Sequence, residues 1–145
     1  MLTGEYNHNM DAKGRVTVPA KFREVLGASF IVTRGFEGCL TAYSMERFDG
    51  IRKHLEQISL TNAAGRKLSR LLLGNAIECE PDQMGRILIS APLRNAADLK
   101  KDVVLCGLGD RVEIWDQEAW NAMNSRDALD DMTPEELEKL EQLEL

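Results

Sequence analysis

The residues best suited to chemistry in this chain form a motif that occurs twice. Asp11-Ala-Lys-Gly-Arg15 returns as Asp82-Gln-Met-Gly-Arg86, at an offset of 71 positions. In each copy the aspartate can accept backbone N–H groups of a turn, and the glycine can take the positive φ that closes it. The arginine that follows has five N–H donors, which suit a carboxylate, a phosphate or a guanine edge. The motif therefore predicts a tight hairpin that presents an arginine.

The repetition extends beyond this motif. A second arginine follows eight residues later in each copy, at Arg23 and Arg94. The similarity continues at an offset of 72, in the pairs Ile31/Val103, Leu40/Val112, Tyr43/Trp115 and Phe48/Trp120. Loops tolerate such a change of one position, so the chain contains two copies of one small module. Each copy buries too little apolar surface to be stable alone, and we expect one shared core that includes the four aromatic side chains.

The repeated arginines have two interpretations. An internal Asp–Arg ion pair would lock the hairpin, and we expect this in at least one copy. Arg23 and Arg94, eight residues further on, are equally suited to bridging the repeats or to contacting a ligand. Arg15 is favoured as a DNA contact because two lysines flank it, whereas Met84 and Pro92 take their places around Arg86.

These considerations assign the candidate residues. The predicted DNA-binding residues are Lys13, Arg15 and Lys21, with Arg23 as a further candidate. The residues predicted to build the motif are Asp11, Gly14, Asp82, Gly85, Arg86 and Arg94. The sequence predicts no catalytic residue, metal site or cofactor, because the two histidines lack partners at ligand spacing and no phosphate-binding or nucleophile motif is found.

Composition points to a cytoplasmic protein. The chain of 145 residues has no apolar run long enough for a membrane span, and no leader peptide is expected at its start. The three cysteines lie far apart, which predicts buried, reduced thiols.

The net charge of −6 is distributed unevenly. Residues 126–145 hold eight acidic and two basic residues and carry all of this charge. Residues 61–75 hold three basic residues and no acidic one. Binding to phosphate depends on local patches more than on the total, so the first repeat and the segment after it are the predicted electropositive face. The acidic tail is not expected to touch DNA.

Each copy is predicted to run strand, turn, strand, short helix, strand, strand, helix. Ser44 and Asp116 occupy equivalent positions and suit the N-caps of the last helices. Thr61 is the expected cap of a helix that links the repeats and extends through Leu73. Thr133-Pro-Glu-Glu136 is a capping box that opens a short acidic helix. The fold class is α+β.

The repeated motifs, together with Gly35-Phe-Glu-Gly-Cys-Leu40 and Glu113-Ile-Trp-Asp116, resemble the MraZ family over about residues 1–125. The resemblance implies two tandem AbrB-like swapped-hairpin modules that share one β-barrel core, flanked by short helices. We expect a DNA-facing first module at 4–60, a basic linking helix at 61–75, a second module at 76–124 and an acidic tail at 125–145. The resemblance also implies a nucleoid-associated transcriptional regulator. It would bind short direct-repeat boxes in double-stranded DNA upstream of its own operon, the division and cell-wall gene cluster, as a ring-like homo-oligomer.

One alternative comes from a different class of protein. AbrB-like modules also occur in antitoxins, and an acidic terminal helix suits the groove of a partner protein. The tandem duplication argues against this alternative, because antitoxins usually carry one module. An enzyme is not expected, since candidate catalytic residues are lacking.

Overall fold

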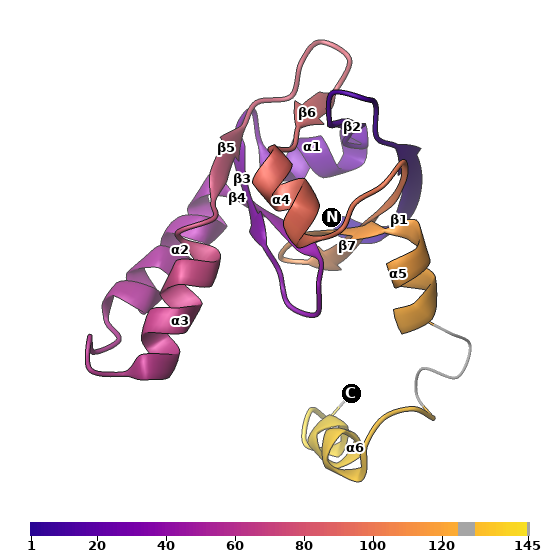
Figure 1. Ribbon diagram of the computed structural model, residues 1–145. Helices are drawn as coiled ribbons and strands as arrows, with labels where there is room; N and C mark the ends of the chain where they lie inside the picture. Colours follow the sequence, from indigo (N-terminus) through magenta and orange to yellow (C-terminus); the bar gives the residue numbers. More distant parts are fainter. Residues whose placement is uncertain (125–129, 145) are drawn as a thin grey trace.

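The computed structural model describes residues 1–124 and 130–144 (Figure 1). The first repeat forms β1 (Leu2–Asn9), β2 (Arg15–Thr17), α1 (Ala20–Leu26), β3 (Phe30–Arg34), β4 (Leu40–Ser44) and α2 (Met45–Glu56). The second forms β5 (Ile77–Cys79), β6 (Arg86–Leu88), α4 (Ala91–Ala96), β7 (Asp102–Gly109), β8 (Val112–Asp116) and α5 (Gln117–Met123). Between them lies α3 (Ala63–Leu72), and α6 (Pro134–Glu141) follows. The α+β class and the repeated order of elements are confirmed.

The two repeats exchange their first strands. A six-stranded antiparallel sheet has the order β1-β7-β8-β4-β3-β5, and β2 pairs with β6 in a separate ribbon. Strand β1 of the first repeat pairs with β7 of the second, and β5 of the second pairs with β3 of the first. If each strand is replaced by its equivalent in the other repeat, the same strand order is obtained in reverse. This pseudo-twofold arrangement confirms the swapped hairpins.

The expected barrel is not closed. Strands β1 and β5 lie at opposite edges of the sheet, and no pairing among the described residues joins them. Strands β2 and β6, which return after the two turns, pair with each other instead and cover one side of the core. Two residues from each returning strand segment are almost completely buried there, namely Val16, Val18, Ile87 and Ile89. The shared core therefore lies between an open sheet and the β2–β6 ribbon.

The four aromatic residues expected in this core lie elsewhere, so that prediction is wrong. Successive side chains of a strand point to opposite faces, and Ala42 and Ile114 take the inward positions. On the outer face, Tyr43 packs against Phe48 of α2, and Trp115 packs edge-on against Trp120 of α5, with ring centroids 6.1 and 5.9 Å apart. Each aromatic pair thus fixes the helix that follows its own strand.

The helix caps mostly agree with prediction. The side chains of Ser44 and Asp116 accept backbone N–H groups at the starts of α2 and α5, and Thr133 forms the predicted capping box with Glu136. The cap of α3 is Asn62 and not Thr61, because Oδ1 of the Asn62 side chain accepts the backbone N–H of Gly65. Of the predicted acidic tail, residues 125–129 and 145 lie outside the described residues. None of the described helices is long and apolar enough to cross a bilayer.

Candidate nucleic-acid interface

Both hairpin turns are held by the same set of hydrogen bonds. Asp11 Oδ1 accepts the backbone N–H groups of Lys13 and Arg15 at 3.0 and 2.8 Å, and its Oδ2 accepts Arg15 Nε at 2.7 Å. In the second turn, Asp82 accepts the N–H groups of Met84 and Arg86 at 2.9 Å, and Arg86 Nε at 2.9 Å. The internal ion pair expected in at least one copy therefore exists in both.

This ion pair orients each arginine without using all of its donors. Only Nε bonds to the aspartate, and the terminal nitrogens of Arg15 and Arg86 have no hydrogen-bond partner among the described residues. The two side chains remain 34% and 26% exposed. A guanidinium fixed along one edge can still offer its other donors to an external acceptor. The turn thus pre-orients a polar group for binding.

The pKa values of both aspartates lie below the ordinary 3.8, chiefly because the N–H of the arginine four residues on bonds to the carboxylate. A carboxyl group whose pKa is lower in the folded state stabilises the fold above its unfolded pKa, and this stabilisation disappears as the pH falls through the folded value. We expect the Asp11→Asn/Asp82→Asn variant to be less stable than wild type near neutral pH. The difference should shrink as the pH falls below the ordinary carboxyl pKa of 3.8, and it should disappear once the pH lies below the folded pKa values of the two aspartates.

Urea unfolding at a series of pH values measures this. Asp130→Asn is the control, because this exposed carboxylate accepts no hydrogen bond from the described residues. A difference that stayed constant as the pH fell through this range would show that the charge of the two aspartates does not hold the turns.

The β2–β6 ribbon places both arginines on one surface. Val16 lies opposite Ile87, and both point into the core. Because side chains alternate along a strand, the positions on either side of this pair face outward: Arg15, Thr17, Arg86 and Leu88. A two-stranded ribbon fits the major groove of DNA, where arginine can bond to guanine in a bidentate manner. The ribbon is therefore the candidate interface.

The second arginine of each repeat lies against the glycine of the other repeat's turn. Arg94 Nη1 donates to the carbonyls of Ile89 and Lys13 at 2.6 and 3.2 Å. A Cβ on Gly14, whose φ is +90°, would overlap the Arg94 guanidinium. In the same way, Arg23 Nε donates to the Val18 carbonyl at 2.9 Å, and its guanidinium lies over Gly85. Arg94 therefore joins the two repeats by a hydrogen bond, whereas Arg23 bonds within its own repeat and packs over Gly85 of the other; each glycine leaves room for its arginine.

The structure separates Lys21 from the first turn, and it brings two other lysines to that turn, Lys100 and Lys101. Lys21 Nζ lies 3.3 Å from the Thr3 carbonyl, near the start of β1, whereas Lys13 follows the end of that strand. Lys100 and Lys101 precede β7 and lie beside the first turn, where the backbone N–H of Met10 bonds to the Lys101 carbonyl.

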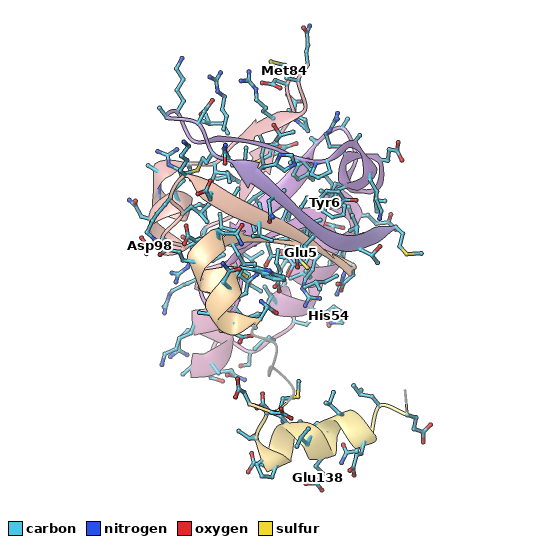
Figure 2. The ribbon with its side chains drawn as sticks, turned by 90° about the vertical axis from the view of Figure 1, so that its right-hand side faces the viewer. Glu5, Tyr6, His54, Met84, Asp98 and Glu138 are labelled. Atoms are coloured by element: carbon cyan, nitrogen blue, oxygen red, sulfur yellow. The ribbon has the colours of Figure 1, made fainter. Side chains whose placement is uncertain are left out.

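The offset of 72 positions between the repeats shows that the second turn lacks lysines equivalent to these two. The positions equivalent to Lys100 and Lys101 are Ala28 and Ser29, and they stand near the second turn. Met84, 69% exposed, occupies the tip of that turn (Figure 2). Lysines therefore gather at the first turn rather than the second. Lys100 is partly neutralised by Asp98 and Asp116.

The basic linking helix does not join this surface. Helices α2 and α3 project as a pair from the side of the sheet away from the ribbon (Figure 1). Arg66, Lys67 and Arg70 of α3 are exposed there. The electropositive face expected from the sequence is thus divided into two separate surfaces.

The described residues offer little for other chemistry. The three cysteines are buried and unpaired, and burial raises the thiol pKa to about 12 at Cys39 and about 11 at Cys79. Thiols with such pKa values stay protonated and unreactive at neutral pH. No group of three potential metal ligands occurs within residues 1–124 and 130–144.

Comparison with known proteins gives one family for both halves of the chain. Residues 1–71 and 72–141 each match the family model described as "MraZ protein, putative antitoxin-like". A transcriptional regulator MraZ of Thermoanaerobacter sp. (strain X514) is 49% identical over 83% of this chain and 84% of its own length. The one from Thermoanaerobacter pseudethanolicus is 45% identical over 97% and 99%, respectively. In Lactiplantibacillus plantarum the identity is 44% over 88% and 91%.

Proposed function

The chain belongs to the MraZ family, and from that premise we propose that it is a DNA-binding transcriptional regulator rather than an enzyme. Its targets are short direct-repeat boxes upstream of its own operon, the division and cell-wall gene cluster, and its location is the cytoplasmic nucleoid. The observation that carries the proposal is the β2–β6 ribbon, on whose outer face two aspartate-oriented arginines retain unused donors.

The proposed DNA contacts are concentrated at the first turn. Arg15 reads a base edge or a phosphate, and Lys13 at the tip of the turn adds a phosphate contact. Lys101 joins them because it is exposed beside that turn. Lys21 and the unused donors of Arg23 supply outer contacts to the DNA backbone. Asp11, Gly14, Asp82, Gly85, Arg86 and Arg94 keep the motif in shape.

One such surface is small, which favours a homo-oligomer. A few cations give weak binding that salt readily reverses. Several copies of the surface on one assembly, placed on several boxes of one DNA, raise the affinity through effective concentration. A ring-like assembly and repeated boxes therefore suit each other.

We expect the protein to bind a duplex from its own upstream region at least tenfold more tightly when all repeated boxes are present than when one remains, because tethered sites raise effective concentration. Fluorescence anisotropy at several salt concentrations measures this, with a scrambled duplex of equal length as control. Equal affinity for the intact and scrambled duplexes would contradict sequence-specific regulation.

The antitoxin alternative retains support from the antitoxin-like description of the family model. It predicts a toxin gene next to this one, whereas methyltransferase and division genes beside it favour the regulator. Inspection of the gene neighbourhood separates the two functions.

A further inference from the structure

The surface formed by α2 and α3 contains an apolar groove. Its volume is about 530 Å³. Its apolar lining comes from both helices and the loop between them, through Leu55, Ile58, Leu60 and Leu73. Leu60 in this lining is 85% exposed, so part of the apolar surface is open to solvent.

The groove is bordered by positive charge. Arg66 and Arg70 line it from α3, a helix without acidic residues. The acidic residue in the lining is Glu56, and Arg52 holds its Oε1 at 2.6 Å. A matching occupant would thus be apolar along one side and acidic along the other.

Helix α6 has these properties. Leu137 and Leu140 are three positions apart and share one face, and Leu137 is 42% exposed. Around them lie Glu135, Glu136, Glu138 and Glu141, with Lys139 as the one basic residue of the helix. In both views α6 stands apart from the rest of its own chain, so its apolar stripe is left uncovered (Figures 1 and 2).

We propose that α6 of one copy docks in the α2–α3 groove of a second copy. An amphipathic helix in an apolar groove is a common recognition mode, and the opposite charges fix its orientation. Since the two surfaces differ, each copy can give one helix and accept another. Contacts of this head-to-tail kind generate rings when the rotation closes. The inference rests on the oligomer of the proposed function and names its interface.

Two full-length variants test this interface. The groove variant Arg66→Glu/Arg70→Glu keeps its own α6, and the tail variant Leu137→Ser/Leu140→Ser keeps its own groove. All four positions are at least partly exposed, and melting curves confirm folding. Each variant alone should have the mass of one chain, 16.3 kDa, by light scattering. Their mixture should form a complex of two chains and nothing larger, because only one intact groove and one intact tail remain.

The control is Lys53→Glu, which reverses a basic charge on the neighbouring helix α2 outside the groove, and it should keep the wild-type mass. A tail variant of wild-type mass would overturn the proposal. So would a mixture of variants that stays monomeric, because that result is expected if α6 docks within its own chain. Loss of binding to a single-box duplex by the groove variant, at wild-type mass, would also overturn it and assign α3 to DNA. If the two variants form the expected complex but the wild-type protein shows no preference for the repeated boxes, the interface is supported and the proposed function is wrong.

Discussion

Alanine at Gly14 should lower the free energy of unfolding by about 3–5 kcal/mol, a large effect for a single methyl group. An L-residue at a φ of +90° is strained. In addition, the new Cβ would overlap the Arg94 guanidinium and approach the Ile89 carbonyl to 3.0 Å. Arg94 would have to leave, and the carbonyls of Lys13 and Ile89 would lose their donor. Urea unfolding measures the loss.

Two comparisons separate backbone strain from the loss of Arg94. Gly38 has the same φ of +90°, but a Cβ there would meet no atom within 4 Å. Gly38→Ala should therefore cost only about 1–2 kcal/mol. In an Arg94→Ala background, Gly14→Ala should lower the free energy of unfolding by about as little as Gly38→Ala does, because the space that the Arg94 guanidinium fills is already empty. Equal costs with and without Arg94 would mean that this arginine does not require the glycine.

The largest functional effect is expected at Arg15. Arg15→Ala should reduce DNA affinity by about 1–3 kcal/mol per engaged subunit if the guanidinium reads a guanine, with specificity relaxed at one base. If Arg15 touches phosphate alone, affinity should fall evenly across sequences and the salt slope should shrink. Anisotropy titrations on matched duplexes distinguish these results.

Arg86→Ala is the internal control, because Arg86 has the same ion pair and lies on the same face of the ribbon. Its turn carries Met84 in place of Lys13, and Ala28 and Ser29 replace the two lysines before β7. It should thus cost similar stability but leave DNA affinity much closer to wild type. Equal loss of affinity from both variants would show that the whole ribbon binds, in spite of the uneven charge.

The sequence predicted what depends on neighbours along the chain. The aspartate and glycine of each turn specify a hairpin by local hydrogen bonding and φ, and the caps at Ser44 and Asp116 are equally local. The bridging by Arg94 was foreseen only as one of two alternatives, since its partner, the first turn, is 80 positions away. The approach of Lys101 to that turn depends on the pairing of β1 with β7, which no local pattern encodes. The alternation of faces along β4 and β8 places Tyr43 and Trp115 outside the core, whereas their apolar character alone favoured burial in it.

The exchange of first strands also bears on how the chain can be made. Leu2 lies opposite Gly109, so β1 leaves the ribosome about a hundred residues before its partner β7 is complete. Loop closure over such a separation is slow, and an unpaired edge is open to other chains meanwhile. Until β7 emerges, β1 stays hydrated through its backbone polar groups and through the exposed side chains of Glu5 and Asn7. Completion of the sheet is therefore a late event of synthesis, reached only when both repeats have emerged.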